Sequence, residues 1–274
     1  SNRDVLEITG ADRLGWLHSL TSQHLESLGA GESFEALVLS PNGHVEHVLA
    51  GVDDGTRMLA WTEPGRAAAL VDFLTSMRFM MRVEVRPRDD LRLTWVGDDV
   101  EVPGDWARRP ALGGREVFRP ADAPLPEGRP AGTWAFDAHR IASGVPRIFV
   151  DTDARTIPNE IGLFGTHLDK GCYRGQETVA RVHNLGRPPR RLTLLHLDGT
   201  AEALPVAGST LELGGRAVGF VGSSARHHEL GPIALALVKR AIPVDVTLTV
   251  DGIAAAQEIL VDPEVGLHFR ANLR

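Results

Sequence analysis

The feature that most constrains the fold is a series of short apolar runs in the C-terminal part of the chain. Turn signals separate them, among them Gly214-Gly215, Gly231-Pro232 and Asp251-Gly252. Regular short strands between such turns are typical of a small β-barrel or sandwich. The pattern therefore predicts strands over residues 192–197, 210–213, 217–221, 233–238, 246–250 and 254–261.

The N-terminal part mixes strand and helix patterns. A leucine repeat after Asp12 predicts a first helix, and a second is expected from Pro64 to about Arg78. Asn42-Gly43 suits the tight turn of a β-hairpin, because both residues tolerate left-handed backbone. We expect a mixed, mainly antiparallel α+β domain with strands over residues 5–8, 34–39, 45–52, 58–61, 83–85 and 91–96.

Between these parts the pattern weakens. Residues 97–133 are rich in Gly, Pro, Arg and Asp, and no clear period returns until Trp134. Such a segment is typical of a lid, a binding loop or a connector, and a plain insertion is an equally good interpretation. We expect an N-terminal α+β domain over 1–96, a second α+β portion over 97–187 and a C-terminal β-barrel over 188–274.

Composition excludes several classes of function. The formal net charge of −7 argues against broad nucleic-acid binding. One cysteine can form neither an intrachain disulfide nor a four-cysteine zinc or iron-sulfur site by itself. His227-His228-Glu229 indicates a metal site only weakly, because adjacent strand side chains diverge, so we expect no metal. No apolar run approaches the ~20 residues of a membrane span and no signal peptide is visible, so we expect a cytoplasmic protein.

The chemistry-bearing stretch is Lys-Gly-Cys-Tyr-Arg-Gly-Gln-Glu at 170–177, which holds the only cysteine and the only tyrosine. If this stretch is extended, Lys170, Cys172 and Arg174 share one face. Nearby cations, and a helix beginning near Gln176, stabilise a thiolate, so Cys172 is a candidate reactive thiol. The alternative is a buried cysteine that only packs. Residues 176–183 read as a helix that Gly186 ends.

This motif, followed by Val179-Ala180-Arg181, resembles the signature of the YgfZ family of folate-binding proteins. That family is related to the T-protein of the glycine cleavage system and includes mitochondrial relatives that act in iron-sulfur protein maturation. Residues 140–146 and Pro158-Asn159-Glu160 resemble two further elements of the family. The resemblance implies a T-protein-like folate-binding unit followed by a small β-barrel.

The resemblance also implies a ligand, partners and site residues. Tetrahydrofolate or a derivative would be the cofactor, and iron-sulfur client enzymes the partners, with an indirect effect on tRNA modification and no direct contact with nucleic acid or membrane. Cys172, Lys170 and Tyr173 would carry the chemistry. The cofactor would contact Arg140, Glu160, Gly171, Gly175, Gln176, Glu177 and Arg181. For Arg140 and Glu160, a structural salt bridge is the alternative.

The chain departs from the T-protein pattern in two places. Glu46 and His47 stand where the T-protein hairpin has paired aspartates, and Ala142 replaces a glutamate. His47 is either a general base or, as we favour, a solvated hairpin residue. The altered hairpin shifts the expected chemistry toward Cys172. We expect Arg187, Arg190 and Arg191 to attract a folate tail or an acidic partner surface or, as we favour, to form a solvated linker.

Three classes of function follow. The first is a tetrahydrofolate-binding accessory protein for assembly, maintenance or repair of iron-sulfur enzymes. The second is a folate-dependent aminomethyl or one-carbon transferase or demethylase. The third is a noncatalytic scaffold in which Cys172 only packs. The sequence leaves open whether the chain is an enzyme.

Overall fold

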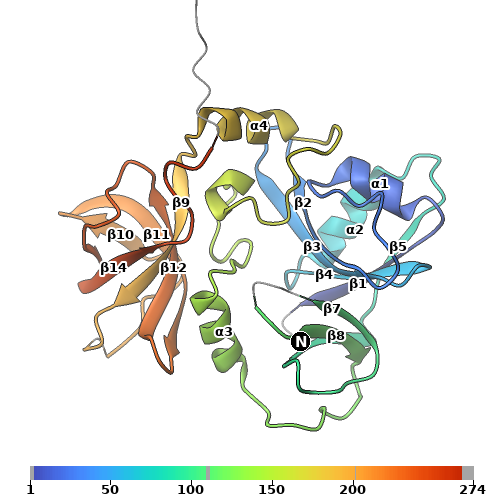
Figure 1. Cartoon of the computed structure of the whole chain (residues 1–274), viewed down its shortest axis with the longest axis horizontal. Helices are drawn as coiled ribbons and strands as arrows, with labels where there is room; N and C mark the ends of the chain where they lie inside the picture. The colour runs from blue at the N-terminus through green and yellow to red at the C-terminus, as the bar shows by residue number, and fades with distance from the viewer. Residues whose placement is uncertain (1–2, 109–111, 201, 267–274) are drawn as a thin grey trace, which may run out of the picture. The chain divides into compact units, whose positions relative to one another are not determined.

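The computed structural model describes residues 3–108, 112–200 and 202–266, and the chain divides into two compact units (Figure 1). Unit 1 comprises residues 1–130 and 165–176, and unit 2 comprises residues 131–164 and 177–274. The chain therefore passes between the units three times, at residues 130, 164 and 176.

Unit 1 is built on a five-stranded antiparallel sheet of order β2-β3-β4-β1-β5. Two helices contribute to its core, in which Leu6, Trp16 and Leu70 are buried together. The antiparallel α+β prediction is thereby confirmed. The elements are β1 (Asp4–Thr9), α1 (Arg13–Leu20), β2 (Ser33–Leu39), β3 (Val45–Asp53), β4 (Arg57–Thr62), α2 (Ala67–Ser76) and β5 (Glu84–Pro87).

The hairpin between β2 and β3 turns where Asn42-Gly43 predicted. Gly43 has a φ of 80°, and its amide donates to the Ser40 carbonyl oxygen at 2.9 Å. Helix α2 is shorter than the predicted span from Pro64 to Arg78. Gly65, with a φ of 74°, precedes its start, and Phe79 lies in left-handed backbone beyond its end.

A three-stranded antiparallel sheet completes unit 1, in the order β6-β8-β7. Its strands are β6 (Leu91–Val96), β7 (Asp105–Arg108) and β8 (Arg115–Pro120). The last two lie in the segment for which the sequence predicted no regular element. Because Glu116 through Arg119 are all buried, β8 shows none of the alternation that betrays a half-buried strand.

Unit 2 is centred on a closed barrel of order β10-β11-β12-β9-β14-β13, drawn in yellow to red in Figure 1. The C-terminal barrel prediction is confirmed, with Leu195, Val221 and Leu248 in its core. Only β11 runs well beyond its predicted bounds. The strands are β9 (Arg190–Leu197), β10 (Thr210–Leu213), β11 (Arg216–His227), β12 (Gly231–Lys239), β13 (Leu248–Val250) and β14 (Ile253–Ile259).

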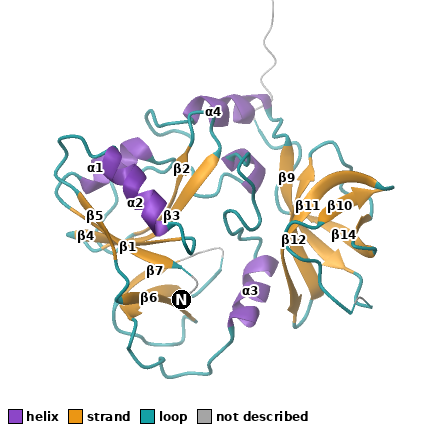
Figure 2. Cartoon of the chain, turned by 180° about the vertical axis from the view of Figure 1, so that it is seen from behind, coloured by secondary structure: helices purple, strands orange, loops and turns teal. Residues whose placement is uncertain are grey.

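The helical elements outside unit 1 are α3 (Thr133–Ala142), the 3-10 helix η1 (Pro158–Ile161) and α4 (Gln176–Leu185), shown in purple in Figure 2. Helix α4 begins where the motif predicted and ends at Gly186, whose φ is 64°. Across the described ranges, none of the helices is long and apolar enough to cross a membrane.

Candidate functional site

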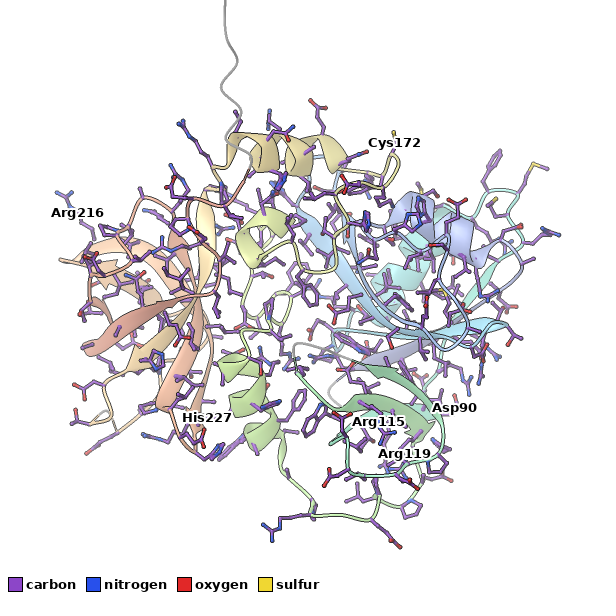
Figure 3. All side chains as sticks on the ribbon, in the orientation of Figure 1. Asp90, Arg115, Arg119, Cys172, Arg216 and His227 are labelled. Carbon is purple, nitrogen blue, oxygen red and sulfur yellow. The ribbon has the colours of Figure 1, made fainter. Side chains whose placement is uncertain are left out.

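The motif stretch forms a loop that leads into α4. We call residues 170–176 the motif loop; they belong to unit 1. Gly171, Cys172 and Tyr173 are irregular, and a turn at Arg174-Gly175 precedes the helix. Cys172 is exposed, and its sulfur points away from the ribbon (Figure 3). The buried packing role considered for this cysteine does not fit that position.

Ser22 anchors the segment that precedes the motif loop. The Ser22 hydroxyl donates to the Gly165 carbonyl oxygen at 2.6 Å and accepts from the Leu37 amide of β2 at 3.0 Å. The His167 amide donates to the Ser22 carbonyl oxygen at 2.9 Å. This fully buried serine therefore ties the approach of the loop to the central sheet of unit 1. Nothing in its local sequence signals that role.

The buried side chain of Lys170 anchors the start of the motif loop. Its Nζ donates to the carbonyl oxygens of His18 and of Thr21, the latter at 2.6 Å, where α1 ends. It also lies 4.8 Å from the centre of the Tyr173 ring. Carbonyls at a helix C-terminus attract a cation because they are unpaired and carry the negative end of the helix dipole.

Burial lowers the pKa of Lys170 to about 8 and raises the pKa of Tyr173 to about 12. Lys170 is buried and Cys172 exposed, so the expectation that the two share one face is wrong. Lys170 and Tyr173 lie inside the loop and support it. A chemical role for either residue stays a prediction.

The end of the motif loop is seated on the β2–β3 hairpin. Arg174 Nη1 donates to Glu46 Oε2 at 3.1 Å, and its guanidinium lies 5.4 Å from the centre of the Phe73 ring. Gly175 has a φ of 82°, and a Cβ there would lie 2.5 Å from the Ser40 carbonyl oxygen. The glycine is therefore required by close contact with the hairpin. Glu46 of the hairpin therefore holds the loop.

His47 is not the solvated residue that we favoured. Its ring stacks on Phe73 at 6.4 Å between centroids, and its Nδ1 is buried with no hydrogen-bond partner among the described residues. Burial, with a smaller contribution from the charge of Arg66, lowers the pKa of His47 to about 4. The imidazole is therefore neutral at pH 7, so it could accept a proton but is a weak base.

Three imidazoles gather beside the Lys170 anchor, a cluster that the sequence did not reveal. The His18 and His24 ring centroids are 4.7 Å apart, and those of His24 and His167 are 5.6 Å apart. His18 Nδ1 accepts from the Leu25 amide at 3.3 Å, which fixes that nitrogen as an acceptor. Within the described ranges, no group of three or more His, Cys, Asp or Glu residues is placed to hold a metal ion.

In unit 2, Arg140 is 1% exposed, and all three of its guanidinium nitrogens donate hydrogen bonds. It donates to Asp151 Oδ2 at 3.0 Å, to the Val145 carbonyl oxygen at 2.6 Å, to Ser223 Oγ at 2.7 Å and to Asp137 Oδ1 at 3.2 Å. Asp151 is also fully buried and accepts from the amides of Arg147 and Ser223. This buried pair joins α3 to strand β11.

Glu160 is also fully buried, and Arg190 holds it. Arg190 Nε and Nη2 donate to its two oxygens at 2.8 Å each, and Arg190 Nη1 donates to Asp153 at 2.6 Å. Arg191 is fully buried too and donates to Gln257 Oε1 at 2.8 Å. The favoured interpretation of a solvated linker is therefore wrong for Arg190 and Arg191, although Arg187 is exposed.

The contacts of Arg140 and Glu160 decide whether these two side chains are available to bind a folate. A pterin needs carboxylate or carbonyl acceptors that it can reach, and its glutamate tail needs accessible cations. Arg140 and Glu160 are closed to solvent and paired with other protein groups, so they do not fit that role in this structure. Their contact with a cofactor stays a prediction. Gly171, Glu177 and Arg181 are exposed, whereas Gln176 Oε1 accepts from the Tyr173 amide.

Comparison with known proteins agrees with the sequence motifs. The chain is 33% identical over 148 residues to the tRNA-modifying protein YgfZ of Edwardsiella ictaluri, covering 52% of this chain and 43% of that protein. It is 25% identical over 238 residues to the mitochondrial iron-sulfur cluster assembly factor IBA57 homolog of Mycosarcoma maydis, covering 73% and 57%. The chain thus spans about half the length of these curated relatives. No protein-family model matches it.

A solved structure shares the fold. The glycine cleavage system aminomethyltransferase T from Bartonella henselae superposes with a TM-score of 0.77 over 98% of this chain and 86% of that one, at 16% sequence identity. At that identity the likeness shows the architecture alone. The chain is thus similar in sequence to YgfZ and IBA57 proteins, and similar in fold to the glycine cleavage system aminomethyltransferase T.

Proposed function

We propose that the chain is a tetrahydrofolate-binding accessory protein for the assembly, maintenance or repair of iron-sulfur enzymes, and that Cys172 is its functional thiol. The observation that carries the proposal is the seating of the motif loop. Ser22, Lys170, Arg174 and Gly175 hold it at separate points, and the one cysteine of the chain stands exposed between them.

These contacts support a functional role, because a cysteine that is held exposed on a fixed loop gains nothing from packing. An exposed free cysteine invites oxidation, and a cysteine needed only for packing would be buried. The relatives support the context, since one is named as an iron-sulfur cluster assembly factor and another as a tRNA-modifying protein. An effect on tRNA modification would be indirect, through iron-sulfur enzymes that modify tRNA.

Folate binding rests on the resemblance of the motif and on the shared fold. Of the residues proposed to contact the cofactor, Gly171, Glu177 and Arg181 are accessible in this structure. Arg181 would supply charge for the glutamate tail, and the bare backbone at Gly171 would allow close approach. Bound tetrahydrofolate would supply a one-carbon carrier, and the residues of this chain would bind and orient it.

Two measurements test the two parts of the proposal. Calorimetric titration of the purified protein with tetrahydrofolate should show saturable binding, which Arg181→Ala weakens. In a strain deleted for the gene, a Cys172→Ala copy should accumulate at the wild-type level yet fail to restore iron-sulfur enzyme activities under oxidative stress. Arg216→Ala, an exposed change in β11, is the matched control and should restore them. Unchanged iron-sulfur activities in the Cys172→Ala strain would overturn the thiol role.

A transferase is the second candidate, and His47 is the observation that favours it. A neutral imidazole with an unpartnered Nδ1 lies in the hairpin where the T-protein has its aspartates. If this candidate is right, protein supplied with tetrahydrofolate and aminomethyl donors should form methylenetetrahydrofolate, and His47→Gln should abolish turnover. The absence of turnover with every donor would leave only the binding role.

A further inference from the structure

A strongly apolar loop follows α2 in unit 1. We call residues 77–82, Met-Arg-Phe-Met-Met-Arg, the methionine loop; it holds three of the four methionines of the chain. Phe79 is 85% exposed and Met80 is 90% exposed, with Met77 and Met81 each about 40% exposed. Single exposed apolar residues are ordinary, but four in one short loop indicate a contact surface.

The methionine loop is held in this exposed position at both ends. Trp16 Nε1 of α1 donates to the Met77 carbonyl oxygen at 3.1 Å. At the other end, the Arg82 amide donates to Asp12 Oδ2 at 2.8 Å, and its guanidinium pairs with the same carboxylate. Between these anchors Phe79 has a φ of 32°, which L-residues rarely adopt. Strained backbone that points an aromatic ring into solvent indicates a functional constraint.

The methionine loop and the motif loop rest on the same two helices. Lys170 of the motif loop binds carbonyls at the end of α1, and Arg174 lies over Phe73 in the last turn of α2. The methionine loop follows directly from α2 and is clamped to α1 through Trp16 and Asp12. A partner that covers the methionine loop is therefore brought to the part of unit 1 that presents Cys172.

The charge of the methionine loop indicates what kind of surface could bind it. Residues 75–82 contain two arginines and no carboxylate, although the whole chain has a net charge of −7. Asp12 neutralises Arg82, whereas Arg78 is exposed and has no ion-pair partner in the part of the chain that the structure describes. The positive charge of Arg78 beside an apolar tip complements an apolar cleft that carries carboxylates at its edge.

Two other occupants fit less well. In a symmetric dimer the Arg78 side chains of two copies would approach each other, and one loop tip is far below the ~800 Å² per partner of a stable interface. An anionic lipid surface would attract Arg78 but repel a chain with a net charge of −7. Methionine side chains adapt to differently shaped clefts, as contact with several client proteins requires.

We propose that the methionine loop is the docking element for an iron-sulfur client protein, which receives Phe79 and Met80 in an apolar cleft rimmed by carboxylates. This inference rests on the proposed function and adds the surface that recognises the partner. It requires Phe79 and Met80 to act as anchors and Arg78 to act through its charge.

The test uses the full chain in the gene-deletion strain. A photo-crosslinking residue at position 80 should join the chain to an iron-sulfur protein identified by mass spectrometry. Arg78→Glu should reduce the yield about tenfold, the effect of losing roughly 1.4 kcal/mol of binding. Phe79→Ser with Met80→Ser should lower iron-sulfur enzyme activities as far as Cys172→Ala does, while tetrahydrofolate binding stays unchanged. Leu125→Ser removes another exposed apolar side chain of unit 1 and is the matched control.

The possible results distinguish a wrong docking role from a wrong proposed function. If Cys172→Ala abolishes the iron-sulfur activities but the double serine variant does not, the docking role is wrong and the proposed function stands. If neither variant lowers them, both ideas fail. Flotation of the wild type, but not of the double variant, with phosphatidylglycerol vesicles would replace the client by a membrane. A dimer in sedimentation that the double variant dissolves would replace it by a second copy.

Discussion

Among the residues that the structure describes, no carboxylate pairs with Lys170, and its ammonium is held by carbonyl oxygens at the end of α1. An ammonium fits such a site because its three donors diverge and can each find a single acceptor, whereas a guanidinium suits paired acceptors. Burial keeps the pKa of this lysine near 8, so it is mostly charged at pH 7. The motif loop of this chain therefore has a structural use for a lysine at this position, beside any chemical one.

His47 permits a prediction about pH. Its pKa is about 4 in the folded protein and near 6.5 when exposed. Between these values the unfolded chain binds more protons, so the free energy of unfolding should fall as the pH drops from about 6.5 to about 4. We expect His47→Gln to flatten this part of the profile, as measured by urea denaturation at closely spaced pH values.

His228→Gln is the matched control for that experiment, since the His228 side chain is 79% exposed. It should leave the profile unchanged. An identical slope for His47→Gln and the wild type would mean that the imidazole is solvated in solution, as the sequence alone suggested.

At the scale of elements, the hairpin and the motif loop form one contact through Gly175. We expect Gly175→Ala to lower the free energy of unfolding by about 1–3 kcal/mol, because a methyl group would meet the Ser40 carbonyl oxygen and the backbone is left-handed. Gly171→Ala is the control in the same loop, since a Cβ there meets nothing within 4 Å. Urea denaturation measures both, and equal stability of the two variants would contradict a fixed seat.

The same contact has a consequence for the thiol. If the seat fixes Cys172, alkylation of Cys172 in Gly175→Ala should differ in rate from the wild type, whereas Gly171→Ala should not change it. The comparison separates a loop that is held in place from one that is merely exposed.

The elements that could be predicted from the sequence are those with a local signature. Barrel strands such as β10 and β12 alternate with glycine turns, and the hairpin turn follows from Asn42-Gly43. Strand β8 could not be predicted because it is buried on both faces and shows no alternation. The partners of Arg140 and Glu160 could not be predicted for another reason. Asp151 and Arg190 are ordinary charged residues in the sequence, and only the fold makes them buried counter-ions.

Site prediction divides in the same way. The motif marked the right loop, because a cysteine between glycines needs no knowledge of the fold. The direction of its side chains depended on contacts with α1 and the hairpin, which lie more than 120 residues away in the chain. The helix predicted from Pro64 ends at about Arg78, inside the methionine loop, and the sequence assigned residues 79–82 to no element and no role.

At the scale of the whole molecule, two separate cores are linked by three passages of the chain. Leu70 belongs to the core of unit 1 and Leu195 to the core of the barrel, and both are fully buried. The core of unit 1 is formed by residues between 6 and 85 and the barrel core by residues between 195 and 255, although each unit also includes a second stretch of sequence. Local stability in such a chain is expected to follow the cores and not the order of the sequence.

We therefore expect Leu70→Ala and Leu195→Ala to act on different sets of amide protons. Each should remove about 2–5 kcal/mol from its own unit by leaving a cavity. Hydrogen exchange followed by mass spectrometry should then show faster exchange for Leu70→Ala in β1 to β4 and in the motif loop, with the barrel strands unchanged. Leu195→Ala should give the reverse. The motif loop belongs to unit 1 although it follows η1 in the sequence. Its exchange rate therefore shows whether local stability follows the cores or the order of the sequence. If the loop followed Leu195→Ala, the Cys172 site would depend on the barrel core, and if both variants accelerated all strands alike, the chain would unfold as one block.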